Sequence, residues 1–179
     1  MQRRWFIYTA VLVLSSLASA GYSFDEVIVE YWAGSGSNES MLVLDFGDDS
    51  YAFGYRWDTA APSSYHALEA IRAGGLMEMS SHYDEGQAGW FVDSLSYGGL
   101  TMSSMAFFTA TDGTDWATSW DGASDRVLSN GAWDGWAAGE WVEVSPDWWE
   151  FSGIPTTPVP EPSLLALLSG GALILRKRK

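Results

Sequence analysis

The side chains that could carry out catalysis are few in this chain and poorly combined. There are two histidines, His66 and His82, no cysteine and no His-Glu-x-x-His pattern. Cysteine nucleophiles and thiolate metal ligands are therefore excluded, and two isolated histidines do not predict a zinc site. The serine-rich stretch 34–40 lacks the Gly-x-Ser-x-Gly spacing of a hydrolase nucleophile. We interpret this stretch as a loop between strands and expect no catalytic residue.

Carboxylates are abundant, with 23 Asp and Glu residues against nine Lys and Arg. A glycoside hydrolase places two carboxyl groups on either side of the scissile bond, but the spacing distinguishes no pair here. Calcium would suit the acidic turns, because it prefers oxygen ligands. Those turns contain Asp45, Asp48 and Asp49, and then Asp112 and Asp115. Neither has the EF-hand spacing, so we assign no metal ligand and expect no cofactor.

The charges are unevenly distributed along the chain. All 23 acids lie within residues 21–161, where the only basic residues are Arg56, Arg72 and Arg126, so this segment has a net charge of −20. Phosphate binding needs basic side chains, and we therefore expect no nucleic-acid partner. A cationic partner, a divalent metal or a neutral polymer stays open. Solubility in an extracellular setting accounts for the same charge, and we favour that interpretation.

Tryptophan is the remaining residue type with functional potential. Seven of the eleven lie between residues 116 and 149: Trp116, Trp120, Trp133, Trp136, Trp141, Trp148 and Trp149. Exposed indoles beside carboxylates can stack on sugar rings, but packing in a small core without disulfides explains the same residues and is favoured. The candidate ligand-stacking residues are Trp133, Trp136, Trp148 and Trp149. The last two are adjacent, so on a strand they would face opposite ways and one would be exposed.

The middle of the chain predicts a β-rich domain over residues 21–155. Stretches 24–31, 41–46 and 51–57 are rich in β-branched and aromatic residues and predict strands, the last two joined as a hairpin. Further strands are expected at 76–80, 89–95, 105–111 and 141–144, the last closing the sheet.

One helix is expected at residues 65–72, with Ser63 or Ser64 as its N-cap and a Gly-Gly pair after its end. Leu68 and Ile71 lie on one face of this helix. The sequence therefore predicts an α+β fold, in which the helix packs on a small, mostly antiparallel sheet. An N-terminal signal helix and a C-terminal apolar helix are expected to flank this domain.

Residues 1–20 have the pattern of a secretory signal peptide, with two early arginines followed by an apolar run. The cleavage site is expected at Ala18 and Ala20, with Gly21 as the first mature residue. An uncleaved anchor helix is the alternative, which the shortness of the apolar run disfavours.

A second apolar segment lies near the C-terminal end. The proline-rich residues 156–162 predict a stiff linker. An uncharged run over 163–175 follows, and then the basic segment 176–179, which is Arg176, Lys177, Arg178 and Lys179. A 13-residue helix spans about 20 Å, short of the roughly 30 Å hydrocarbon core. We expect a short transmembrane segment with its basic end in the cytoplasm and the domain outside.

The C-terminal region carries a specific resemblance. Val159, Pro160, Glu161 and Pro162, followed by the apolar run and the basic end, resemble the PEP-CTERM sorting signal over residues 158–179. The resemblance implies export across an inner membrane and processing at Pro-Glu-Pro by the membrane enzyme exosortase. It implies the secretion machinery and exosortase as partners, transient residence in the inner membrane, and a final place at the cell surface or outside the cell. A plain membrane anchor is the alternative.

A looser resemblance covers residues 55–143. The short helix with its Ala-Leu-Glu-Ala sequence at 67–70, the segment 89–95 and the segment 122–131 are similar to the transcobalamin-like C-terminal domain. This resemblance implies a β-grasp-like fold.

Taken together, these features predict an exported, non-enzymatic surface or extracellular-matrix protein. The alternative is a carbohydrate- or small-ligand-binding module, with extracellular polysaccharide as the candidate partner. An enzyme such as a glycan hydrolase is the least favoured interpretation.

Overall fold

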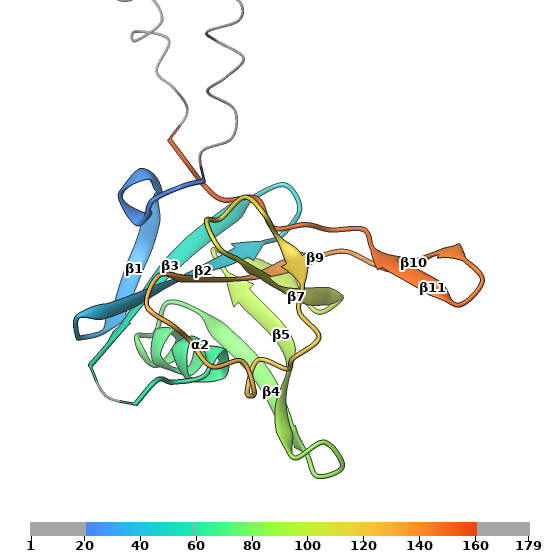
Figure 1. Cartoon of the computed structure of the whole chain (residues 1–179), viewed down its shortest axis with the longest axis horizontal. Coiled ribbons are helices and arrows are strands. Elements are labelled where there is room, and N and C mark those ends of the chain that lie inside the picture. Colours follow the sequence, from blue (N-terminus) through green and yellow to red (C-terminus); the bar gives the residue numbers. More distant parts are fainter. Residues whose placement is uncertain (1–20, 59, 161–179) are drawn as a thin grey trace, which may run out of the picture.

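The computed structural model describes residues 21–58 and 60–160. The strands in these ranges are β1 (Val29–Gly34), β2 (Asn38–Asp45), β3 (Ser50–Trp57), β4 (Glu78–Asp84), β5 (Gly89–Tyr97), β6 (Leu100–Met102), β7 (Met105–Ala110), β8 (Ala117–Thr118), β9 (Ala132–Ala138), β10 (Trp141–Ser145) and β11 (Trp148–Phe151). The helical elements are the 3₁₀ turn η1 (Phe24–Glu26) and the helix α2 (Ser64–Ala73). The domain is therefore α+β and β-rich, as expected (Figure 1).

A six-stranded sheet in the order β1-β3-β2-β9-β7-β8 forms the centre of the domain. The expected β2–β3 hairpin is confirmed as an antiparallel pair. The pairs β1–β3 and β2–β9 are parallel, so the sheet is mixed. Six of the eight β2 residues are buried. A continuous apolar run such as Met41–Leu44 is typical of a strand covered on both faces.

One face of this sheet packs against α2 and against a separate three-stranded sheet, β4-β5-β6. Leu42 and Leu44 of β2 contribute to this core, and Leu68 and Ile71 of the helix are fully buried in it. The expected face of the helix is thereby confirmed. Ser63 is the N-cap, because its hydroxyl accepts the His66 N–H, and the helix ends at a glycine as expected.

The opposite face carries a second core of Met41, Val43, Ala52 and Trp133, covered partly by the chain before β1. The expected strand 24–31 is wrong in its first half, because residues 24–26 form a 3₁₀ turn. The Ser23 N–H and hydroxyl both donate to Glu26 Oε2, at 2.8 and 2.9 Å, which closes the turn. The Phe24 ring then packs edge-on against Trp133, with 5.0 Å between ring centroids.

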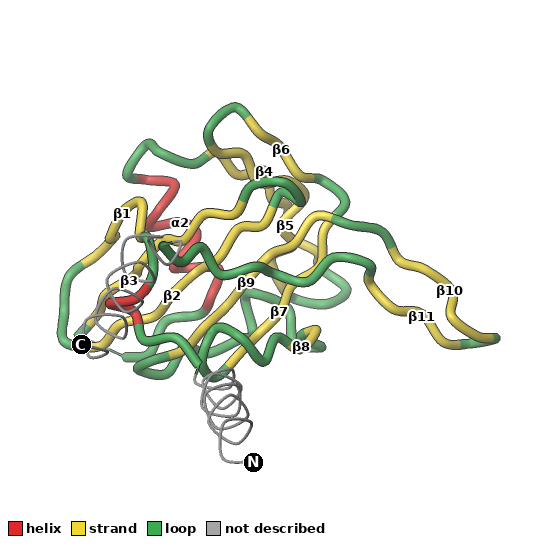
Figure 2. The backbone as a smooth tube through the Cα atoms, turned by 90° about the horizontal axis from the view of Figure 1, so that it is seen from above, coloured by secondary structure: helices red, strands yellow, loops and turns green. Residues whose placement is uncertain are grey.

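The strand at 141–144 does not close the sheet, contrary to expectation. The last strand of this sheet in the sequence is β9, an interior strand that is parallel to β2 and antiparallel to β7. Because β9 is almost entirely buried, its sequence shows no apolar–polar alternation. The expected strand is β10 instead, which pairs only with β11 in a hairpin that projects from the domain (Figures 1 and 2).

The segment after β11 returns across the domain in an extended form. A Cβ on Gly135 would lie 2.9 Å from Pro155, so the glycine in β9 permits this close approach. The Thr156 N–H donates to Asp45 Oδ2 at 2.7 Å, and the Ile28 N–H donates to Pro158 O at 2.9 Å. The contacts of the domain thus continue past residue 155, into the segment expected to be a linker.

The two ends of the described domain lie close together (Figure 1). The Tyr22 N–H donates to Asp112 O at 2.7 Å, and the Thr157 hydroxyl donates to the neighbouring Gly113 O at 2.5 Å. Among the described helices, none is long and apolar enough to cross a membrane. The segments 1–20 and 163–175, where the signal and transmembrane helices are expected, lie outside the described residues.

Candidate functional site

Two of the four tryptophans nominated as ligand-stacking residues are core residues. Trp133 and Trp136 are only 2% and 3% exposed, because both faces of β9 are covered. Trp136 stacks on Phe107, with 4.4 Å between ring centroids. Trp148 and Trp149 on β11 are about half exposed and could contact a ligand.

The residues of the expected processing sites lie at or beyond the limits of the described structure. Ala18, Ala20, Glu161, Pro162 and the basic end lie outside it. Val159 and Pro160 are the last described residues. Gly21 is the first, and it lies so close to the Asp112 side chain that an added Cβ would overlap it.

The acidic turns use their carboxylates to hold the chain itself. Asp45 Oδ1 accepts the Gly47 N–H at 2.8 Å, and Asp115 Oδ1 accepts the Thr111 N–H at 2.8 Å. This second bond and the Thr111 hydroxyl lower the pKa of Asp115. No group of three or more His, Asp or Glu side chains suited to a metal occurs within residues 21–58 and 60–160.

The two histidines are placed apart from one another. His66 belongs to the helix cap, with Nδ1 2.7 Å from the Ser63 hydroxyl. His82 on β4 lies with Nδ1 2.8 Å from Asp93 Oδ1, and both side chains are exposed. An exposed pair of this kind contributes little to stability.

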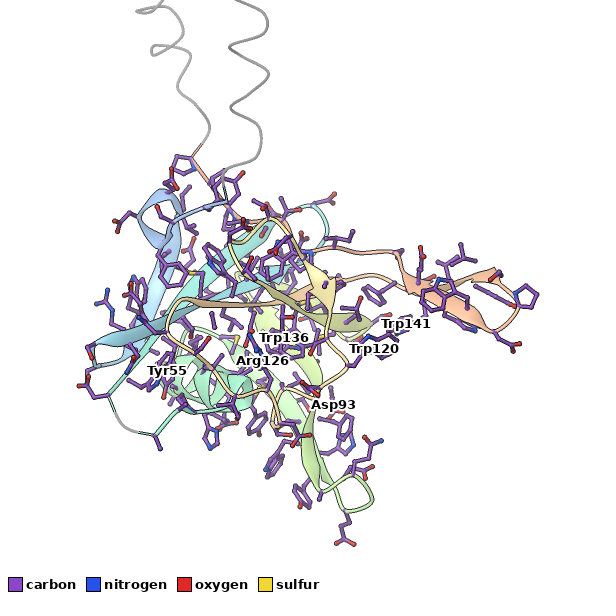
Figure 3. The ribbon with its side chains drawn as sticks, in the orientation of Figure 1. Tyr55, Asp93, Trp120, Arg126, Trp136 and Trp141 are labelled. Atoms are coloured by element: carbon purple, nitrogen blue, oxygen red, sulfur yellow. The ribbon has the colours of Figure 1, made fainter. Side chains whose placement is uncertain are left out.

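A hollow of about 370 Å³ between β5, β7 and the loop 119–125 is lined by several aromatic side chains and is the first candidate site for a ligand. Three aromatic side chains of its lining are exposed: Trp90 by 41%, Phe91 by 36% and Trp120 by 88%. Figure 3 labels Trp120 and also Trp136, which belongs to the wall of the hollow. The polar side chains of the lining are Gln87, Ser119, Asp121, Ser124 and Asp125.

Backbone hydrogen bonds hold the loop that carries Trp120. The Ser119 N–H donates to Phe107 O at 2.8 Å. At the start of α2, the Tyr65 N–H donates to Ala123 O in the loop and the Ser64 N–H donates to Arg126 O directly after it, each at 2.9 Å. Helix N-termini have N–H groups without intrahelical partners, and here the loop and the residue after it accept them. The loop is therefore held in place before any ligand arrives.

Two of the aromatic side chains are supported on one ring face by the domain. Trp90 stacks on Tyr65, with 5.5 Å between centroids and 12° between planes. Phe91 stacks on His82, with a centroid distance of 5.7 Å. Burial raises the pKa of Tyr65, whose hydroxyl donates to Glu69. Rings that are already held lose less conformational entropy when a ligand binds.

A second hollow of about 220 Å³ lies beside the projecting hairpin. Its lining includes Trp141, Trp148 and Trp149 of the hairpin and Phe151 at its base. Trp141, labelled in Figure 3, packs edge-on against Phe151 with 5.4 Å between centroids. Trp120 lines both hollows, so the two are adjacent.

Sequence reasoning did not nominate Trp90, Phe91 or Trp120. The signal that could have identified Trp120 is the Asp-Gly pair directly after it, because such pairs form turns at the surface. Trp90 and Phe91 gave no comparable signal, since their exposure depends on which sheet β5 joins.

A buried carboxyl group supports the fold behind the site. Asp134 on β9 is 2% exposed, and its Oδ1 accepts from Arg126 Nε at 3.3 Å. Burial raises its pKa, opposed by the Ser64 hydroxyl and the Arg126 guanidinium. This pair connects β9 to the end of the loop that carries Trp120.

No protein-family model, curated protein or solved structure matches the chain significantly. The resemblances to the PEP-CTERM signal and to the transcobalamin-like domain therefore stay predictions. The site can stack rings on indoles and accept hydrogen bonds at carboxylates, which is the chemistry of binding a polyhydroxylated ligand.

Proposed function

We propose that this chain is an exported surface or extracellular-matrix protein that exosortase sorts through the PEP-CTERM signal and that acts without catalysis. The observation that carries the proposal is the meeting of the two ends of the domain at Asp112 and Gly113. Until the signal peptide is cleaved, the segments before and after the domain are both expected at the membrane, and chain ends that lie on one side of the domain suit that arrangement. The acidic, lysine-free composition of residues 21–161 suits a soluble domain outside the cell.

Topology can be tested with a reporter that is active only after export. One fusion places the reporter in the exposed turn between β4 and β5, and the other places it after Lys179. We expect activity from the first fusion and none from the second before processing. If both fusions prove cytosolic, the proposal is overturned.

Sorting can be tested by changing the Pro-Glu-Pro element in a host that contains exosortase. We expect Glu161→Ala to leave uncut protein in the membrane fraction. Ile154→Ala is the matched control, because Ile154 is 62% exposed and precedes the element. Equal processing of the two variants would contradict the sorting part of the proposal. Processing of the parent chain in a host without exosortase would contradict it as well.

A second candidate function, carbohydrate binding, is favoured by the first hollow. Trp120 is 88% exposed and stands beside carboxylate and amide side chains. The test is isothermal titration of the protein with neutral glucans, mannans, xylans and galactans. We expect Trp120→Ala to abolish binding, whereas Ile28→Ala, a change at an exposed apolar residue outside the lining of this hollow, leaves binding intact. No heat from any polysaccharide would eliminate this candidate.

A further inference from the structure

We infer that the two hollows form one extended groove that holds a polysaccharide chain without negative charge across Trp120. The inference rests on the proposed carbohydrate binding and adds the length and the charge class of the ligand. Below, "groove" means the joint lining of the two hollows.

The shared tryptophan is the first reason to treat the hollows as one site. Trp120 lines both, and its side chain is almost fully exposed. No ring among the described residues is paired with it, in contrast to Trp90 and Phe91. Its indole is therefore available to a ligand that passes from one hollow to the other.

The volumes of the two hollows also indicate that they form one site. The first, at about 370 Å³, lies near the lower end of the roughly 300–1,000 Å³ that small-ligand sites occupy, and the second, at about 220 Å³, lies below it. The second hollow alone is thus too small for a typical ligand. Joined to the first hollow, it can hold a further part of a longer ligand.

The register of the hairpin extends the groove outward. Trp141 lies opposite Phe151, and Glu143 lies opposite Trp149. Because alternate residues of a strand share a face, Trp141 and Trp149 lie on the same side of the hairpin. Both are about half exposed. Aromatic rings therefore continue from the body of the domain along the arm seen in Figures 1 and 2.

Charge selects the class of polymer. The groove contains Asp121, Asp125 and Glu150, and no lysine occurs in residues 21–161. Uronic-acid polymers and a second copy of this acidic chain would both be repelled. Uncharged sugars instead offer hydroxyl donors to the carboxylates and apolar ring faces to the indoles.

The test compares short and long neutral oligosaccharides on the full-length protein. Dimers and hexamers of the sugars in the panel above are titrated by calorimetry. We expect at least one hexamer to bind ten or more times more tightly than its dimer. Trp149→Ala should reduce the affinity for the hexamer to about that for the dimer and leave the affinity for the dimer unchanged, whereas Trp120→Ala should abolish the binding of both.

Thermal melts of each variant test whether lost binding comes from unfolding. We expect unchanged melting temperatures, because both side chains are exposed. Equal affinities for dimer and hexamer, with no effect of Trp149→Ala, would overturn the extended groove and leave single-site binding standing. Absence of any binding would overturn both. If polygalacturonate binds more tightly than every neutral oligomer, the claim that the ligand carries no negative charge is overturned. If poly-lysine is the only polymer that binds at Trp120, the claim that the ligand is a polysaccharide is overturned.

Discussion

Asp45 and Thr156 lie 111 residues apart in the chain and are joined by a hydrogen bond of 2.7 Å from the Thr156 N–H to Asp45 Oδ2. The bond connects the end of a central strand to the segment that leaves the domain. Asp45 is 5% exposed, and its other carboxylate oxygen accepts the Gly47 N–H. One side chain thus closes a turn and fastens the C-terminal segment.

Asp45→Ala should lower the free energy of unfolding, because two partly buried N–H groups lose their acceptor. An unsatisfied buried donor costs about 1–3 kcal/mol. Urea denaturation measures the change. Asp48→Ala in the same turn is the control, because Asp48 is exposed. Equal losses of unfolding free energy in the two variants would show that the hydrogen bond between Thr156 and Asp45 does not stabilise the fold.

Trp133→Ala should be severely destabilising, whereas Trp148→Ala should not. Trp133 is buried between Phe24 and Trp116, and removing such a ring costs about 3–5 kcal/mol. Trp148 is 54% exposed, and surface changes usually stay within about 0.5 kcal/mol. Thermal denaturation of the two variants separates core from surface tryptophans. Similar melting temperatures would contradict the assignment.

Gly54→Ala should also destabilise the protein. A Cβ at Gly54 would overlap the ring of Trp32, which also carries the Arg56 guanidinium 4.1 Å from its centroid. Overpacking of this kind costs about 1–3 kcal/mol. Gly122→Ala is the control, because its Cβ would only make an ordinary contact at 3.7 Å. A neutral Gly54→Ala would mean that Trp32 moves aside without cost.

The pH dependence of stability should contain a contribution from Asp134. Burial raises the pKa of Asp134 in the folded protein above its value in the unfolded chain, about 3.9. As the pH rises past the pKa of Asp134 in the unfolded chain, the unfolded chain loses the carboxyl proton while the folded protein keeps it. The free energy of unfolding therefore falls with pH until the pKa of the folded state is passed. Below about pH 3.9 both states keep the proton and this penalty is absent.

Asp134→Asn removes this contribution while keeping a similar shape. We expect the stability of the variant relative to the parent to increase from about pH 3.5 to about pH 7, measured by urea denaturation. Asp121→Asn, an exposed change with the same charge difference, is the control. A difference between variant and parent that does not change with pH would contradict the expectation.

The elements that the residue pattern predicted well are those specified by neighbours in sequence. The hairpin of β2 and β3 follows from two apolar runs separated by turn residues. The helix α2 follows from Ser63, two apolar residues three apart and a glycine. Strand β9 was missed, because burial on both faces removes the alternation on which a strand prediction depends.

The candidate site could be predicted only in part, for a similar reason. Tryptophan content indicated an aromatic surface, and Trp148 and Trp149 are indeed exposed. The same reasoning placed Trp133 and Trp136 there, because residue type does not reveal which side of a strand is covered. Trp90 and Phe91 become part of a site only through the packing of β5 beside the loop 119–125.

The sequence by itself determined the class of the domain, its local hairpin and helix, its acidic character and the lack of cysteine chemistry, because these depend on composition and on contacts within a few residues. Only the tertiary structure decided which tryptophans are exposed, that β9 lies between β2 and β7 in the sheet, and that both ends of the described domain meet at Asp112 and Gly113. The parallel pairings β1–β3 and β2–β9 join segments that no local signal connects. Such pairings are selected by the burial of both sheet faces together, which is a property of the whole chain.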